Sequence, residues 1–290
     1  MEECENKAGA EAETEVEAKV EAGVKAEASE PKKNRFEEFV DMHGWSGSTL
    51  KLIAVVTMLI DHIGAGLLER FAMEHPERLL WGLNADQIKD IDFVMRSIGR
   101  IAFPIYCFLL VEGFVKTSNV WKYFTRLMIF GLISEVPFDL CFFGAFPYWE
   151  HQNVMFSLAL GVLMLICIDR AGKALLDPEK GNKRQGFAGF VQFLIMIPFA
   201  VVAYFAFVDY VCLAIFVIFV FYLGRKSRVG NLLAMTGSCF ILDEIPALAG
   251  LIPLALYNGK RGLKLKYFFY SFYPAHILLI WLFGKFILKL

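Results

Sequence analysis

Residues 50–68 read LKLIAVVTMLIDHIGAGLL, and this stretch decides how the whole chain is interpreted. It is apolar and close to the roughly 20 residues that a helix needs to cross a bilayer. Asp61 and His62 stand next to each other within it. Ionisable groups are costly in hydrocarbon, and they commonly mark a functional site there. The stretch therefore predicts a membrane-spanning helix with a candidate catalytic pair, in which His62 is a general base and Asp61 assists it.

Lys51 adds a second charged group to the same helix face. It lies eleven residues before His62, which is almost three whole turns and roughly 16 Å along a helix. One face would then carry a cation at the membrane surface and a titratable group near mid-depth. The alternative is a lysine that snorkels to the surface and a histidine bonded to a neighbouring helix. Asp61 is turned about 100° from His62 on the helix, so it could instead pair with Arg96 or Arg100 of the second span.

Composition places the chain in the membrane class. Apolar residues make up 57%, aromatic residues 15%, and the mean hydropathy is +0.51, whereas soluble domains are about 45–50% apolar. The net charge is −1 and no continuous basic face is evident, so we expect no nucleic-acid partner. The six cysteines lie mostly in apolar runs without metal-like spacing, and we interpret them as small buried hydrophobes.

Three regions follow from this patterning. Residues 1–34 are rich in Glu, Ala, Val and Lys with few large apolar groups, which is typical of a disordered acidic tail, here expected in the cytoplasm. Residues 35–48 resemble a short segment lying on the membrane surface. Residues 49–290 form the predicted transmembrane domain.

Nine apolar segments within that domain predict an all-α polytopic protein of the cell membrane that contacts lipid. Lys and Arg gather in alternate loops, so the positive-inside rule predicts a cytoplasmic N-terminus. The segments around Asp243 to Pro246 are the shortest and could instead form one broken re-entrant unit. The predicted spans are roughly 50–69, 99–116, 122–143, 153–169, 189–206, 209–224, 230–243, 245–258 and 267–288.

The depth of the remaining polar residues suggests a cavity reached from both faces. Basic groups at the inner surface would bind an anionic cofactor, and a polar cluster in the outer half would bind an acceptor. The predicted cofactor-binding residues are Lys51, Lys260 and Arg261, and the predicted acceptor-side residues are His276, Arg100, Glu135, Asp139 and Asn153.

Each of these residues has a structural alternative. The basic residues could reflect the ordinary positive-inside bias. His276 lies about nine residues past the inner end of the last span, at a depth similar to that of His62. It follows a Tyr-Pro kink and could bond to a carbonyl that the proline frees. Glu135 and Asp139 could pair with Arg100 across helices, and Asn153 could cap the fourth span.

The histidine and carboxylate side chains described above are suited to acyl transfer. A neutral imidazole removes a proton from an attacking amine or hydroxyl, and a carboxylate fixes its tautomer and stabilises its charged form. The chain contains no GxSxG motif, so an acyl-enzyme on serine is not expected.

The chain also resembles the TraX family, known from acetylation of the N-terminus of a conjugative pilin, over nearly everything after residue 48. The resemblance implies acetyl transfer from cytoplasmic acetyl-CoA to an acceptor at or beyond the membrane, either a peptide amine or a glycan hydroxyl. TraX proteins are similar in turn to membrane-embedded bacterial O-acyltransferases, whose first helix carries a basic residue before a histidine, as Lys51 and His62 do here. The acidic tail departs from the family pattern. The blocks that carry the resemblance are LKLIAVVTMLIDHIGA (50–65), IGRIAFPIYCFLLVEGF (98–114), LISEVPFDL (132–140), QNVMFSLALG (152–161), YNGKRG (257–262) and KYFFYSFYPAHILLI (266–280).

Two other functions use the same residues. A proton-coupled small-solute transporter could relay protons through Asp61, His62 and Glu135, but such transporters favour two related halves, and no internal repeat is evident. A metal site from His62, His276 and Asp61 would lack the usual spacing of ligands, and we expect no metal.

Overall fold

The computed structural model describes residues 35–175 and 182–290, so the predicted acidic tail of residues 1–34 lies outside the described residues. The chain divides into two compact units, residues 1–44 and 45–290. The described part of the first unit is helix α2 (Arg35–His43), and its place at the membrane surface stays a prediction.

The expected all-α class is confirmed. Across residues 35–175 and 182–290 the regular elements are helices, accompanied by isolated β-bridges and no extended strand. After α2 they are α3 (Gly47–Ile63), η1 (Gly64–Glu69), α4 (Arg70–Glu74), α5 (Ala85–Gly99), α6 (Ala102–Lys116), α7 (Val120–Phe142), α8 (Val154–Leu175), α9 (Asn182–Phe205), α10 (Val211–Gly224), α11 (Arg228–Ile241), η3 (Ile245–Gly250), α12 (Leu251–Ala255), α13 (Lys266–Phe283) and η4 (Gly284–Leu288).

The chain is a membrane protein by the length and composition of its helices. Within the described ranges, five helices are long and apolar enough to cross a bilayer, and they cover residues 47–74, 85–116, 154–174, 186–205 and 266–288. Helix α7 has 23 residues but carries four charged side chains. Helices α11 and α12 have 14 and 5 residues, which is short of a crossing and favours the re-entrant alternative there. The number nine and the orientation stay predictions.

One sequence-based boundary was wrong. The second span was expected to begin at residue 99, after a mixed-charge loop of residues 70–98, but much of that loop is helical. Helix α5 begins with a capping box, in which Asn84 and Gln87 each accept a hydrogen bond from the other's backbone N–H at 3.0 and 3.1 Å. Such reciprocal bonds satisfy two otherwise unpaired donors and start a helix well before the apolar run.

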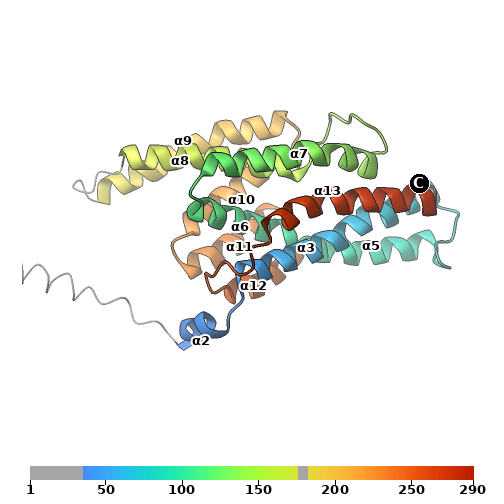
Figure 1. The fold of residues 1–290 in the computed structure, drawn as a ribbon, viewed down its shortest axis with the longest axis horizontal. Helices are drawn as coiled ribbons and strands as arrows, with labels where there is room; N and C mark the ends of the chain where they lie inside the picture. The colour runs from blue at the N-terminus through green and yellow to red at the C-terminus, as the bar shows by residue number, and fades with distance from the viewer. Residues whose placement is uncertain (1–34, 176–181) are drawn as a thin grey trace, which may run out of the picture. The chain divides into compact units, whose positions relative to one another are not determined.

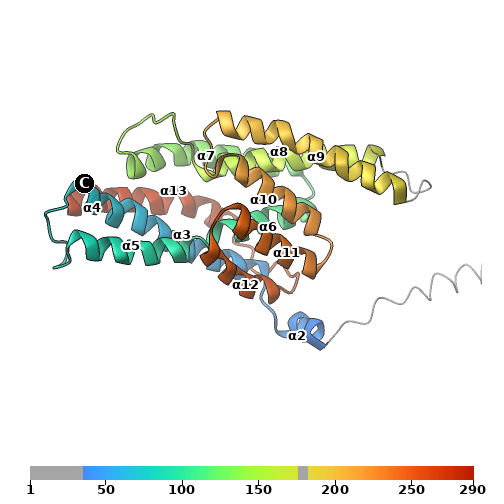
Figure 2. The same cartoon turned by 180° about the vertical axis from the view of Figure 1, so that it is seen from behind.

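The first and last long helices contact each other within the second unit. Figure 1 shows α13 beside α7 and α3, and α3 packs in turn against α5 and α6. Seen from behind in Figure 2, α8, α9 and α10 form a second group in which each helix contacts the other two. This arrangement brings α3 and α13, which are distant in sequence, into contact.

Glycines allow α3 and its continuation η1 to approach their neighbours closely. A Cβ atom at Gly66 would lie 2.8 Å from Ile280 Cγ2 on α13 and 2.9 Å from Cys141 Sγ on α7. A Cβ atom at Gly99 on α5 would lie 2.2 Å from Cβ of Asp61. The six residues of η1 form a π-helix directly after α3, and π-helical turns inside longer helices are frequent at functional sites.

The start of α3 is fastened to the segment between α12 and α13. Ser46 caps the helix by accepting a hydrogen bond from Thr49 N. Gly47 N and Ser48 N donate to the carbonyls of Lys260 and Arg261 at 2.8 and 3.1 Å. These bonds place the basic segment beside the first turn of α3, where Lys51 lies.

Candidate functional site

A hydrogen bond between two histidines joins the first and last long helices. Nδ1 of His62 on α3 lies 2.7 Å from Nε2 of His276 on α13, and Nδ1 of His276 lies 2.7 Å from the carbonyl oxygen of Phe272. Only 4% of His276 is exposed. His62 also meets the ring edges of Phe142 and Tyr273, with centroids 5.3 and 6.0 Å away. The two histidines that the sequence placed at similar depth are therefore direct partners.

Asp61 pairs with an arginine on α5. Nη1 of Arg96 lies 2.7 Å from Oδ2 of Asp61, and the missing side chain at Gly99 makes room for the carboxylate. Oδ1 of Asp61 is buried and has no hydrogen-bond partner among the described residues. This is the alternative partner that the sequence allowed for Asp61, and a role in assisting His62 stays a prediction.

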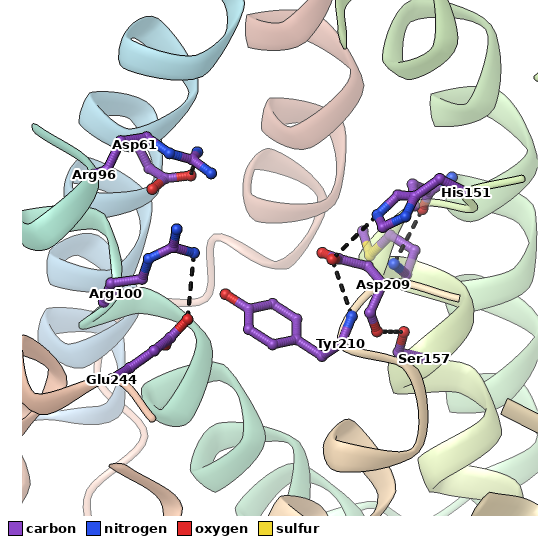
Figure 3. A network of polar contacts seen from close by, with 10 residues as sticks. Asp61, Arg96, Arg100, His151, Ser157, Asp209, Tyr210 and Glu244 are labelled. Atoms are coloured by element: carbon purple, nitrogen blue, oxygen red, sulfur yellow. Dashed lines mark hydrogen bonds and ion pairs between the residues drawn. The ribbon is translucent and has the colours of Figure 1, made fainter. Parts of the chain in front are cut away.

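A cavity of about 420 Å³, here named the histidine cavity, opens in front of His62. Asp61, Arg96 and Arg100 form one of its walls, and Arg100 makes an ion pair of 3.3 Å with Glu244 (Figure 3). Its lining residues are Met58, Asp61, His62, Ala65, Glu69, Arg70, Met73, Arg96, Gly99, Arg100, Ala102, Phe103, Tyr106, Phe138, Phe142, Phe143, His151, Val154, Asp209, Tyr210 and Tyr273.

The opposite wall comes from two short loops that sequence reasoning missed. Nε2 of His151 lies 3.4 Å from Oδ1 of Asp209, and Ser157 Oγ donates to the Asp209 carbonyl at 2.6 Å. Figure 3 shows Tyr210 beside them with its hydroxyl directed across the cavity towards Arg100 and Glu244. Helical periodicity carries no information on loop residues, and the loop between α9 and α10 reads AFVDY (206–210), in which Asp209 is the one charged residue.

A second cavity of about 510 Å³, here named the cationic cavity, lies around the start of α3. Seven lysine and arginine side chains line it, against one acidic residue, Glu112. Lys51 and Arg261 are among the seven, whereas Lys260 is absent from the lining, and cofactor binding by all three stays a prediction. The cationic residues are Lys51, Lys116, Lys122, Arg126, Arg261, Lys264 and Lys266.

Arg126 is one of the partly buried cations of this cavity. Its guanidinium lies over the rings of Tyr123 and Tyr270, at 5.7 and 6.0 Å from their centroids. Its Nε atom is buried without a hydrogen-bond partner in the part of the chain that the structure describes. Lys116, by contrast, is paired with Glu112 at 2.5 Å. A guanidinium with one buried, unused donor is suited to an anionic ligand.

The two cavities share a wall. Met58, Tyr106, Val154 and Tyr273 line both of them. Met58 is four residues before His62 and seven after Lys51, so all three lie near one face of α3. A group passing between the cavities would pass these four side chains and reach His62.

Of the five predicted acceptor-side residues, only Arg100 lines either described cavity; His276 is bonded to His62 behind the lining, and the other three lie elsewhere. Asn153 donates to the Gly131 carbonyl at 2.9 Å, contacts Glu135 and accepts from Met155 N at 3.0 Å, which caps α8. Asp139 accepts from Tyr148 N at 2.8 Å. Neither cavity includes these three residues in its lining. Their contacts fasten α7 to the loop before α8, and acceptor binding by them stays a prediction.

Comparison with known proteins identifies the family. The profile of the TraX protein family matches residues 46–284. The chain belongs to the TraX family. A probable fimbrial assembly protein FimC, serogroup H1, of Dichelobacter nodosus is 30% identical over 261 residues, covering 81% of this chain and 94% of the relative. An uncharacterized protein of Rickettsia prowazekii is 30% identical over 112 residues, covering 39% of this chain and 33% of the relative. No solved structure matches the chain.

The contact between His151 and Asp209 makes the stability of this TraX family member depend on pH. The hydrogen bond to Asp209 raises the pKa of His151 above its ordinary value of 6.5. A raised pKa in the folded state stabilises the protein fully below the unfolded pKa, and this contribution is lost as pH rises through the folded pKa. The effect is small because 37% of the His151 side chain is exposed.

We therefore expect His151→Gln to lower the melting temperature at about pH 5.5 and to leave it unchanged at about pH 9, where histidine is neutral in both states. Thermal unfolding of wild type and variant in the same detergent measures this. A deficit of the variant that stays constant or grows with pH would contradict the assignment.

Proposed function

We propose that this TraX family member is a multi-pass acetyltransferase of the cell membrane. It moves an acetyl group from cytoplasmic acetyl-CoA to an acceptor at or beyond the membrane. The observation that carries the proposal is the placement of His62 in a polar cavity that shares a wall with a cavity lined by seven cationic side chains.

The cationic cavity fits the phosphate groups of coenzyme A. Arginine binds phosphate through several N–H donors in a planar fork, and lysine acts as a mobile point charge. Arg126 has an unused buried donor, and Lys51 lies over the Phe269 ring at 5.7 Å. Phosphates bound among these groups would leave the acetyl thioester free to extend along α3 towards Met58.

His62 performs the proton transfer. As the acceptor's nitrogen or oxygen forms a bond to the acetyl carbon, His62 takes the proton that the acceptor loses. The carbon–sulfur bond then breaks, and His62 returns the proton to the departing thiolate. Atoms and charge balance, and the histidine ends as it began. Catalysis of this kind needs a base within hydrogen-bond reach of the acceptor, which the position of His62 on the cavity lining allows.

The acceptor binds in the histidine cavity. The name of the relative from Dichelobacter nodosus, a fimbrial assembly protein, supports a pilin N-terminal amine. A glycan hydroxyl would undergo the same chemistry. Positive and negative side chains balance across the cavity walls, with Arg96 and Arg100 facing His151 and Asp209 (Figure 3).

A proton-coupled small-solute transporter is the second candidate. The ion pair of Asp61 with Arg96 lies in helices long enough to span the membrane, and buried pairs of this kind also occur on transport pathways. A transporter has no use for coenzyme A, so cofactor binding separates the two functions.

Removing cations from the cationic cavity should weaken acetyl-CoA binding. We expect Lys51→Ala and Arg126→Gln each to raise the dissociation constant by about 10- to 150-fold, on the scale of one lost charge-assisted contact of about 1.5–3 kcal/mol. Lys89→Ala is the matched control, because Lys89 is exposed and lines neither cavity. Calorimetry on purified protein measures the constants. Absence of acetyl-CoA binding by folded wild type would favour the transporter.

Loss of His62 should abolish transfer without unfolding the protein. We expect His62→Ala to lower acetyl transfer and slow acetyl-CoA hydrolysis by about 10²–10⁴-fold, the usual scale for losing a general base. Acetyl-CoA affinity should stay near that of wild type, because the phosphates bind elsewhere. His75→Ala is the control, since His75 lines neither described cavity. Wild-type rates in His62→Ala would remove His62 from the mechanism.

A further inference from the structure

We propose that His276 is a positioning residue that holds His62 in one tautomer, with the proton on Nδ1 and the free lone pair of Nε2 turned towards the histidine cavity. The sequence assigned His276 to the acceptor side, but it is absent from the lining of both cavities. Its catalytic consequence rests on the proposed function, whereas the tautomer itself can be measured without any activity.

The Phe272 carbonyl fixes the direction of both hydrogen bonds made by His276. The Phe272 carbonyl oxygen can only accept, so Nδ1 of His276, 2.7 Å away, must donate to it. A neutral imidazole carries one N–H, and therefore Nε2 of His276 is an acceptor. Nδ1 of His62, 2.7 Å from that atom, must then be the donor. Nε2 of His62 is therefore unprotonated, and it lies on the side of the ring away from His276.

The geometry of the pair favours a directed hydrogen bond over loose contact. The two ring planes are 4° from parallel, with centroids 4.9 Å apart and the bonded nitrogens 2.7 Å apart. The centroids are farther apart than the nitrogens by nearly the width of a ring, so the rings meet edge to edge in one plane. The N–H of one ring therefore points along the lone pair of the other, which is the preferred alignment.

Neighbouring aromatic rings prevent the pair from turning. Phe272 stacks on His276 with centroids 4.7 Å apart and planes 15° apart. Phe142 and Tyr273 place their rings at 68° and 65° to His62. A histidine whose orientation is set by packing and by a hydrogen bond is ready to act as a base without rearrangement.

The pair also replaces the carboxylate that a general-base histidine commonly uses. Asp61, the adjacent acid in the sequence, is bound to Arg96 and does not supply this contact. When His62 accepts a proton on Nε2, it becomes an imidazolium that still donates from Nδ1 to His276. The Phe272 carbonyl lies at the far end of this chain of bonds, and its partial negative charge stabilises the added proton.

Two variants at residue 276 separate positioning from simple packing. In His276→Gln the amide oxygen can reach the place of Nε2 and accept from His62, whereas His276→Leu fills the space without an acceptor. We expect His276→Leu to lower kcat by about 10²-fold or more, the lower end of the scale for impaired acid–base catalysis. The KM for acetyl-CoA should change little, and His276→Gln should recover most of kcat. Equal losses in both variants, or no loss in either, would overturn the proposal.

Nitrogen-15 NMR of histidine-labelled wild-type protein tests the tautomer directly. The measurement is made at about pH 8, where an unperturbed imidazole is neutral, and signals of His62 are identified by their absence in His62→Gln. We expect a protonated Nδ1 and an unprotonated Nε2 in wild type, retained in His276→Gln and lost or mixed in His276→Leu. The opposite tautomer in wild type would overturn the proposal even if acetyl transfer is shown. Wild type without acetyl-CoA activity but with the expected tautomer would refute only the proposed function.

Discussion

Polar groups in a membrane-spanning helix must find their partners inside the protein, and the contacts of α3 follow from that requirement. Asp61 binds Arg96 on α5, and His62 binds His276 on α13. These bonds connect α3 to helices on two sides. They need close approach, which Gly99 supplies next to Asp61 and Gly66 supplies against α13 and α7. Removing one partner of such a pair would leave an uncompensated polar group, so the pairs constrain how the helices can pack.

Helix α3 lines two chemically different cavities along its length. Lys51 lines a cavity rich in cations, and His62, almost three turns further on, lines a cavity in which charges are paired. Met58, Tyr106, Val154 and Tyr273 stand between them. In an acetyltransferase this wall would keep the bulk of the cofactor on one side and the acceptor on the other. Excluding water from the meeting point would favour transfer over hydrolysis.

Much of the fold could be predicted because apolar runs of the right length report membrane helices directly. Counting residues also placed His62 and His276 at similar depth, which their hydrogen bond confirms. Depth alone does not give the rotation of a helix about its axis. The sequence therefore could not show that His62 hydrogen-bonds to His276 rather than to Asp61. His151 and Asp209 were missed because they lie in loops far apart in sequence, which tertiary contacts such as the bridge between Gln152 and Val208 bring together. The short helices α11 and α12 were hard to classify because their apolar runs fit both a crossing and a re-entrant segment.

A structure of the protein bound to a non-hydrolysable acetyl-CoA analogue tests the roles of the two cavities most directly. We expect phosphate density among Lys51, Arg126 and Arg261, with the acetyl end passing Met58 to lie within hydrogen-bond reach of the acceptor space in front of His62. An analogue bound in the histidine cavity with the cationic cavity empty, or no bound analogue at saturating concentration, would contradict these roles.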